Sequence, residues 1–115
     1  MREVVTVQVG QCGNQVGLRF WEHALREQGA EEGRESLSTF FRVEQRQGKE
    51  TLKSRAVLID MEEGVINRTF KSKLGALFDK DQTVTDVSGA GNNFSHGYSE
   101  YGSKYKEKIF PIHKL

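Results

Sequence analysis

The stretch Glu3-Val-Val-Thr-Val-Gln-Val-Gly-Gln-Cys-Gly-Asn-Gln15 decides the fold, because it passes from a strand-forming pattern through glycine into a helical one. Over Glu3–Val9 the valines alternate with polar residues, which predicts a β-strand. The adjacent valines Val4 and Val5 indicate apolar contacts on both faces, as in a parallel sheet covered by helices. Gly10 then breaks the strand. We therefore expect a strand, a glycine turn and a helix in close succession.

The helix is expected over Asn14–Gln28, with Gly29 as its C-terminal cap. The apolar residues that recur at helical spacing along it, and that should face the core, are Val16, Phe20, Trp21, Ala24 and Leu25. The polar segment Ala30–Ser54 follows. We interpret it as a long connection that contains a short helix, with Phe40 and Phe41 as a small apolar cluster beneath it.

The remaining chain continues the alternation of strands and helices. Arg55–Asp60 is a continuous apolar run that ends in an acid, which predicts a second strand. A short, irregular helix is expected over Val65–Phe78, a third strand over Thr83–Val87, and a further helix from beyond Asn93 that runs through the tyrosines and ends near Pro111. This order predicts an α/β fold, a Rossmann-like parallel sheet with flanking helices.

Composition narrows the classes of function. The chain has 115 residues and a net charge of +1, with basic and acidic residues interspersed, so we expect neither nucleic acid nor a membrane surface as a partner. The single cysteine, Cys12, rules out an intrachain disulfide and fits a reducing, cytoplasmic compartment. No apolar segment reaches the length of a transmembrane helix. The histidines share no metal-ligand spacing, and we assign no catalytic residue.

Each predicted strand is followed by a loop with the chemistry of a nucleotide site. Gly10–Gln15, with Gly17 one turn beyond, offers glycines and amides at a helix N-terminus, where backbone N–H groups bind anions. Asp60–Gly64 supplies carboxylates suited to Mg²⁺ held through water. Ser88–Asn93 is rich in Gly, Ser and Asn, which form anion-binding nests. Each loop taken alone is also explained as a glycine turn, a solvated acidic loop or an ordinary turn. Three together at three strand ends favour a ligand site.

Two of these loops resemble a known family. The stretch Val7-Gln-Val-Gly-Gln-Cys-Gly-Asn-Gln-Val-Gly17, followed by Phe20-Trp-Glu22, resembles the opening of a tubulin. Ser88-Gly-Ala-Gly-Asn-Asn93, with Gly97 and Tyr98, resembles the tubulin loop that covers the phosphates. Four stretches resemble the epsilon branch more than alpha or beta tubulin, namely Phe20-Trp-Glu-His-Ala-Leu-Arg-Glu27, Phe40-Phe-Arg42, Leu58-Ile-Asp-Met-Glu-Glu-Gly-Val65 and Thr85-Asp-Val-Ser-Gly89. Glu63 also stands where alpha and beta tubulins carry proline.

The resemblance implies a site for GTP and Mg²⁺. The residues that it assigns to GTP are Gly10, Gln11, Cys12 and Gly13 in the first phosphate loop, Gln15 near the base, Asp60 and Glu62 near the Mg²⁺ and γ-phosphate, and Gly89, Ala90, Gly91 and Asn92 in the third loop. Gln11 and Glu62 would hold Mg²⁺, largely through water. The family hydrolyses GTP on assembly, with an acidic residue from the next subunit. The implied partners are other tubulin subunits or centriolar proteins, and the implied locations are the cytoplasm, the cytoskeleton, and the centrosome, centriole or basal body.

The sequence also departs from the family. Phe94 stands in place of the usual tryptophan, and the resemblance covers residues 1–109 but not the tail 110–115. The motif GGGTGSG, which follows the family's fourth strand, is missing, and the family is several times longer. We therefore expect residues 1–115 to be a partial tubulin/FtsZ-like GTPase domain, its N-terminal part, with strand order 3-2-1. For this chain alone we expect weak or absent GTP binding and no hydrolysis, with Glu3–Val9 left as an apolar sheet edge.

Two other functions remain open from the sequence. One is a nucleotide-free interaction fragment that docks on tubulins or centriolar proteins. The other is a dinucleotide-binding enzyme, against which the absence of G-x-G-x-x-G counts.

Overall fold

The computed structural model describes residues 2–28 and 38–109, and its centre is a three-stranded parallel sheet. The strands are β1 (Thr6–Val9), β4 (Ala56–Asp60) and β5 (Thr83–Thr85), in the order β1-β4-β5. The predicted strands and their 3-2-1 order are confirmed, although each strand is shorter than its sequence pattern. Within the described residues β1 is an edge strand.

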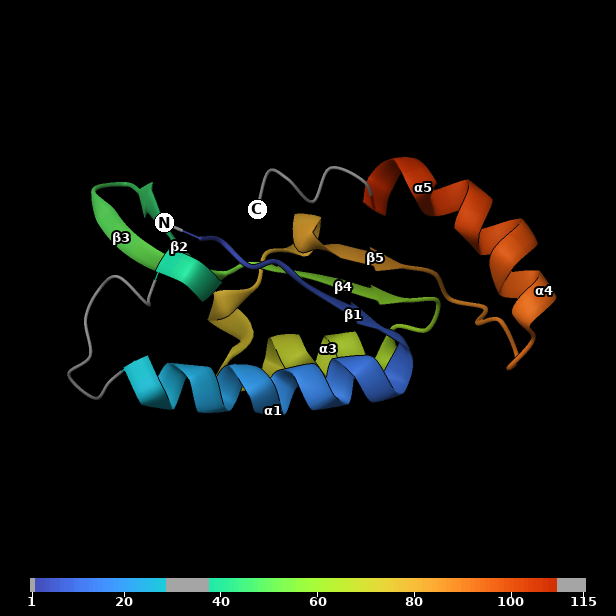
Figure 1. The fold of residues 1–115 in the computed structure, drawn as a ribbon, viewed down its shortest axis with the longest axis horizontal. Coiled ribbons are helices and arrows are strands. Elements are labelled where there is room, and N and C mark those ends of the chain that lie inside the picture. The colour runs from blue at the N-terminus through green and yellow to red at the C-terminus, as the bar shows by residue number, and fades with distance from the viewer. Residues whose placement is uncertain (1, 29–37, 110–115) are drawn as a thin grey trace.

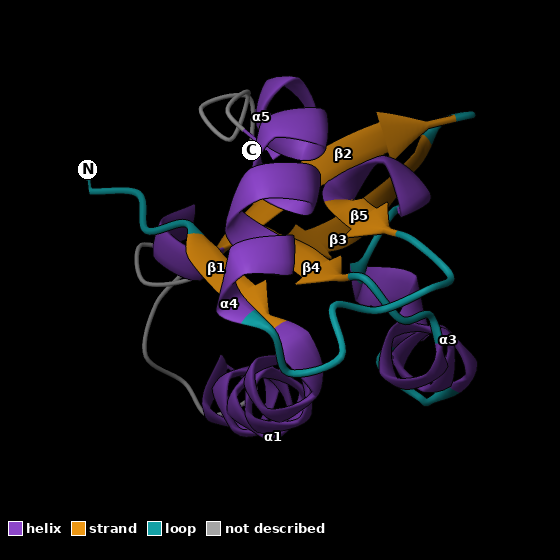
Figure 2. Cartoon of the chain, turned by 90° about the vertical axis from the view of Figure 1, so that its right-hand side faces the viewer, coloured by secondary structure: helices purple, strands orange, loops and turns teal. Residues whose placement is uncertain are grey.

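Helices cover both faces of this sheet (Figure 1). Helices α1 (Gly10–Gln28) and α3 (Gly64–Lys71) lie on one face. A continuous helical segment lies on the other; it comprises α4 (Phe94–His96), the π-helical segment Gly97–Gly102 and α5 (Ser103–Ile109) (Figure 2). This arrangement confirms the expected α/β fold with flanking helices. None of the described helices combines the length and the apolar character that crossing a bilayer requires.

Each face has its own core. On the α1 side the buried cluster is Trp21, Ala24, Phe41, Ala56, Leu58, Ile66, Leu77 and Phe78. On the α5 side it is Val57, Ile59, Val84, Tyr101 and Tyr105. Because β4 contributes alternate residues to both clusters, it is buried on both sides, which explains its continuous apolar run.

The faces of β1 differ from the expected pattern. The side chain of Gln8 is buried (4% exposed), whereas Val7 and Val9 are 47% and 62% exposed. Gln8 tolerates burial because its amide is hydrogen-bonded to Asn14 and Trp21. Helix α1 also leaves Val16 and Phe20 exposed, so only part of its apolar set faces the core.

The polar connection proved to contain a β-hairpin instead of only a loop and a short helix. Strands β2 (Phe41–Arg46) and β3 (Lys49–Ser54) pair antiparallel around a two-residue turn. Both turn residues, Gln47 and Gly48, have positive φ (52° and 76°), the geometry of a hairpin turn whose twist matches the strands. Phe41 is 1% exposed and belongs to the main core, so the prediction of a satellite cluster was wrong. Residues 29–37, with the predicted cap Gly29, lie outside the described residues.

The helix expected over Val65–Phe78 is shorter than predicted, because α3 covers only Gly64–Lys71 and the segment after it is irregular. Helix α3 ends at Lys71, where the Ser72 hydroxyl donates to the Thr69 carbonyl at 2.7 Å. Two short 3₁₀ turns follow, over Gly75–Leu77 and Lys80–Gln82. A Cβ on Gly75 would lie 2.1 Å from the Phe70 carbonyl oxygen, so this turn requires glycine.

An ion-pair cluster fastens the hairpin to the amino end of the sheet. The Asp79 carboxylate lies 2.9 Å from Lys53 Nζ and 3.3 Å from Arg42 Nη2. Burial by itself raises the pKa of Asp79, but the hydrogen bond from Lys53 and the charges of Lys53, Arg46 and Arg42 outweigh it, and the pKa is lowered. Asp79 is therefore a carboxylate at neutral pH and holds the hairpin in place.

Candidate functional site

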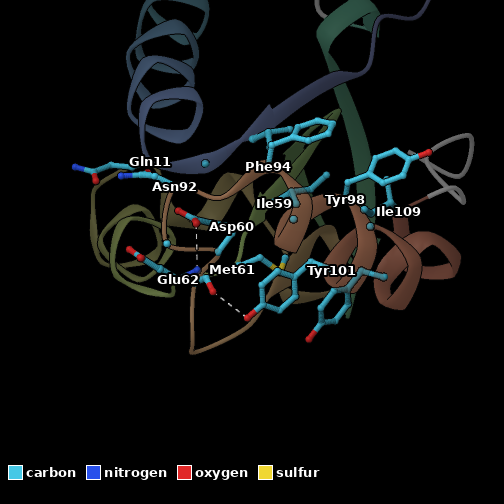
Figure 3. Close-up of a pocket in the computed structure, with 18 residues that line it drawn as sticks. Gln11, Ile59, Asp60, Met61, Glu62, Asn92, Phe94, Tyr98, Tyr101 and Ile109 are labelled. Carbon is cyan, nitrogen blue, oxygen red and sulfur yellow. Dashed lines mark hydrogen bonds between the residues drawn. The ribbon is translucent and has the colours of Figure 1, made fainter.

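The loops that follow β1, β4 and β5 meet in a cavity of about 750 Å³ at the carboxyl edge of the sheet (Figure 3). This is the edge at which parallel α/β sheets bind their ligands. The loop residues that line the cavity are Gly10 and Gln11 from the first loop, Asp60, Met61 and Glu62 from the second, and Gly89, Ala90, Gly91 and Asn92 from the third. The fold thus brings most of the sequence-predicted site residues together.

The first loop is shorter than expected, because α1 begins at Gly10 directly after the strand. Gly10 has φ +78°, and Gly10 and Gln11 line the cavity at the helix N-terminus. Three other predicted residues do not line the cavity. Cys12 and Gln15 are exposed on the first turns of α1. Gly13 faces the strand instead, since a Cβ added to it would lie 3.6 Å from the Gln8 backbone. The first N–H groups of a helix have no partner within it, and a helix N-terminus of this kind can bind an anion.

The second and third loops are joined directly. The Gly89 N–H donates to the Met61 carbonyl at 2.9 Å. Within the second loop, the Glu62 N–H donates to Asp60 Oδ1 at 3.1 Å. A Cβ added to Gly89, which has φ +68°, would lie 2.7 Å from Glu62 Oε1. The Glu62 carboxylate therefore lies against the third loop only because residue 89 has no side chain.

The third loop is fixed from the other side by two tyrosines. Tyr101 Oη donates to the Gly89 carbonyl at 3.0 Å and makes a short contact with Ser88 Oγ. Tyr105 Oη donates to Asp86 Oδ2 at 2.5 Å. This hydrogen bond and that from the Val87 N–H lower the pKa of Asp86 to about 2. The loop is thus held at its base by side chains from the π-helical segment and α5.

Aromatic and aliphatic side chains line the rest of the cavity, and sequence reasoning did not assign them to a site. They are Val9, Ile59, Phe94, Tyr98, Tyr101, Tyr105 and Ile109. Figure 3 shows Phe94, Tyr98 and Ile109 on the side away from Gln11 and Asn92. The sequence did contain a signal for this aromatic lining, because Tyr98, Tyr101 and Tyr105 are spaced so that they share one face of a helix.

The side chains that line the cavity could hold Mg²⁺ only together with a ligand that supplies further oxygen atoms. Among the described residues that line it there is no Lys or Arg, and Asp60 and Glu62 are both acidic. No cluster of three or more His, Cys, Asp or Glu side chains able to hold a metal lies within residues 2–28 and 38–109. One or two carboxylates with water and phosphate oxygens are the usual Mg²⁺ ligands in nucleotide sites. The residues therefore fit Mg²⁺ bound together with a phosphate ligand.

A parallel sheet with helices on both faces and glycine-rich loops at its carboxyl edge defines a Rossmann-like nucleotide-binding class of α/β protein. Within that class the chain belongs to the tubulin/FtsZ family, because the family model for the GTPase domain matches residues 3–112.

The similarity to individual tubulins is greater for epsilon chains than for beta chains. The chain is 47% identical to the tubulin epsilon chain of Homo sapiens and 45% identical to that of Mus musculus. Both alignments cover 95% of the 115-residue chain. It is 38% identical to the tubulin beta-1 chain of Homo sapiens, over 97% of its length. The chain spans about a quarter of these relatives, 26% of each.

Proposed function

We propose that this chain is part of an epsilon-like, GTP-binding cytoskeletal protein and carries the phosphate and Mg²⁺ side of its nucleotide site. The observation that supports this most strongly is the convergence of three glycine- and acid-containing loops on one cavity. The family match adds a reason to choose GTP among nucleotides, because its description is that of a GTPase domain.

Each loop has a defined task in this proposal. Backbone N–H groups at Gly10 and around Gly91 bind phosphate oxygens, since glycines with positive φ help to form anion-binding nests, while the Gly89 N–H is engaged by the Met61 carbonyl. Gln11 and Glu62 hold Mg²⁺ through water, with Asp60 beside them. Ala90 and Asn92 complete the third loop. Cys12 and Gly13 remain assigned to the first loop and Gln15 to the base, although they lie outside the cavity lining.

Binding should depend on Mg²⁺. The cavity supplies carboxylates and no basic side chain in its described lining, so a bare triphosphate meets net negative charge. A bound Mg²⁺ supplies the positive charge that bridges the carboxylates and the phosphates. The GTP affinity should therefore fall when Mg²⁺ is chelated.

We propose that residues 1–115 alone bind GTP weakly and do not hydrolyse it, because the sequence contains no GGGTGSG motif and no assigned catalytic residue. The test is a thermal melt with Mg²⁺ and GTP, with ATP, NAD and EDTA as controls. GTP at a concentration equal to its Kd adds about 0.4 kcal/mol of stability, so a small, Mg²⁺-dependent rise specific to GTP is expected. A rise with NAD would instead favour a dinucleotide enzyme, and GTP turnover that is lost in site variants would contradict the absence of hydrolysis.

The cellular role follows the same proposal. The partners are other tubulin subunits or centriolar proteins, and the location is the cytoskeleton at the centrosome, centriole or basal body. We propose residues 1–109 as the tubulin-like part of the GTPase domain and 110–115 as a divergent tail, although the family match extends to residue 112. Localisation of a tagged chain at centrioles supports this role, whereas a diffuse signal that does not overlap a centriolar marker counts against it.

A nucleotide-free docking role is favoured by one further observation. The edge strand β1 exposes Val7 and Val9, and Val4 before it is 43% exposed. Unpaired strand edges with apolar side chains readily pair with another chain. Co-purification with tubulins that survives Mg²⁺ chelation and substitution of Glu62 would favour docking over nucleotide binding.

A further inference from the structure

The side-chain amide of Asn14 links two loops of the site. Asn14 is fully buried (0% exposed) in the second turn of α1. Its Nδ2 donates to the Gly10 carbonyl at 2.8 Å and to the Ile59 carbonyl at 3.1 Å. Gly10 opens the first loop, and Ile59 directly precedes Asp60 of the second. One amide therefore ties the carboxyl ends of β1 and β4 together.

The orientation of this amide is fixed by two further buried groups. Gln8 Nε2 donates to Asn14 Oδ1 at 3.3 Å, and Trp21 Nε1 donates to Gln8 Oε1 at 2.8 Å. Because the indole can only donate, it sets the orientation of the Gln8 amide, which in turn sets that of Asn14. A flipped Asn14 would place its oxygen against two carbonyl oxygens. A Cβ on Gly17 would lie 2.2 Å from the Gln8 side chain, so glycine at 17 leaves the space for this network.

We propose that Asn14 is a positioning residue of the nucleotide site, which holds the first loop and the Asp60–Glu62 loop in one fixed arrangement. The proposal rests on the proposed function for its ligand, Mg²⁺ with GTP. The N–H groups at Gly10 and the carboxylate of Glu62 can act on one Mg²⁺–phosphate group only if their separation is constant. Asn14 sets that separation without touching the ligand.

The chain offers a matched control for Asn14 in a second buried amide, Gln82, which bonds to the backbone at the opposite end of β4. Gln82 is 2% exposed, and its Nε2 donates to the carbonyls of Ser54 and Ala56 at 3.0 Å each. Gln82 and Asn14 are therefore both buried amides with two backbone carbonyl acceptors. They differ in position, because Gln82 lies at the amino end of β4, away from the cavity.

The test compares Asn14→Ala with Gln82→Ala in two measurements. The first needs no ligand and records ¹⁵N order parameters of the backbone. In Asn14→Ala we expect the order parameters of the amides in both loops, 10–13 and 60–62, to fall from about 0.85 toward the flexible range near 0.6. In Gln82→Ala the same amides should stay rigid. Loosening confined to residues 10–13, or equal loosening in both variants, would overturn the proposed link.

The second measurement is the affinity for Mg²⁺–GTP at a temperature where both variants are folded. We expect Kd to rise about tenfold in Asn14→Ala, the scale of one buried hydrogen-bonded group, and less than about twofold in Gln82→Ala. Equal losses would assign Asn14 a merely structural role. If the unaltered chain binds no GTP, the proposed function fails, and the order parameters still decide whether Asn14 links the loops.

A second variant guards against an unfolded Asn14→Ala protein. Gln8→Met removes the amide that orients Asn14, but Asn14 can still donate to the carbonyls of Gly10 and Ile59. It should loosen the same two loops to a smaller extent than Asn14→Ala. Loops 10–13 and 60–62 that stay as rigid as in the unaltered chain would overturn the role of the Trp21–Gln8–Asn14 network.

Discussion

The two ends of the central sheet differ in where their polar groups find partners. At the amino end, Asp79 pairs with Lys53 and Arg42, and Gln82 bonds to two backbone carbonyls. Arg42 Nε and Glu44 Oε2 are the buried polar side-chain atoms without a hydrogen bond in the described residues. This end is therefore occupied almost wholly by internal contacts, and its polar groups serve stability.

At the carboxyl end the polar groups are left available. The side chains of Gln11, Glu62 and Asn92 are exposed, and within the described part of the chain they have no hydrogen-bond partner. Their supports, Asn14 and Tyr101, are buried and fully engaged. A rigid base beneath uncommitted polar groups in a concave site is the arrangement of a ligand site. We therefore assign stability to the amino end and propose binding for the carboxyl end.

The largest expected effect comes from a residue that supports both ends. Trp21 is fully buried, packs on Phe41 and Phe78 and donates to Gln8. Trp21→Ala should lower the free energy of unfolding by about 3–5 kcal/mol, because it leaves a large cavity. Urea unfolding measures this. The neighbour Phe20 is 40% exposed, so Phe20→Ala should cost clearly less, and equal losses would show that α1 packs differently.

The next prediction separates the two ends by charge. Asp79→Ala leaves Lys53 and Arg42 without their carboxylate and should cost about 1–3 kcal/mol of stability. It should leave the Mg²⁺–GTP affinity unchanged, since the hairpin is remote from the cavity. Asp81→Ala is the control, because Asp81 is exposed and should change stability by less than about 0.5 kcal/mol. Loss of GTP binding in the folded Asp79 variant would break the proposed division between the ends.

A smaller effect compares two glycines with similar backbone geometry. Gly89 (φ +68°) and Gly48 (φ +76°) lie at opposite ends, and alanine at either position should cost about 1 kcal/mol. At Gly48 a Cβ meets nothing within 4 Å, whereas at Gly89 it meets Glu62 Oε1 at 2.7 Å. Gly89→Ala alone should therefore displace the Glu62 carboxylate and weaken Mg²⁺-dependent binding. An isothermal titration of each variant decides this, and equal affinities would remove Glu62 from the Mg²⁺ site.

The smallest effect is on proton binding at the carboxyl end. The lowered pKa of Asp86, about 2 against an ordinary 3.8, means that its ionised form favours the folded state. This contribution is present above about pH 4 and is lost as the pH falls toward 2. Tyr105→Phe removes the first cause, the hydroxyl hydrogen bond, so the pKa of Asp86 should rise toward 3.8. NMR titration of the Asp86 carboxyl carbon checks this, and an unchanged pKa would contradict the assigned hydrogen bond.

The sequence allowed the sheet to be predicted because β4 is apolar on both faces and because Gly10 and Asp60 mark the carboxyl ends of β1 and β4. The loops of the site could be predicted for the same reason. The hairpin was missed because its strands alternate charged residues with few apolar ones, and Gln47–Gly48 is a weak form of the hairpin signal.

The supports of the site could not be read from the sequence, since they depend on tertiary contacts. Gln8 looked like the polar face of a strand, yet it is buried because Gly17 and Trp21 stand opposite it. Asn14 looked like a helix-start residue, and only the position of Ile59 from a strand 45 residues away reveals its second bond. Burial of polar groups is decided by distant partners, which local patterns do not contain.

The most direct test of the central claim is an NMR titration of the ¹⁵N-labelled chain with Mg²⁺–GTP at millimolar concentration. We predict that shifted amides cluster in residues 10–11, 60–62 and 89–92, that the turn residues 47–48 and Asp79 do not shift, and that EDTA abolishes the effect. Shifts centred on the hairpin, or the same shifts with GTP when Mg²⁺ is absent, would contradict the assignment of binding to the carboxyl end of the sheet.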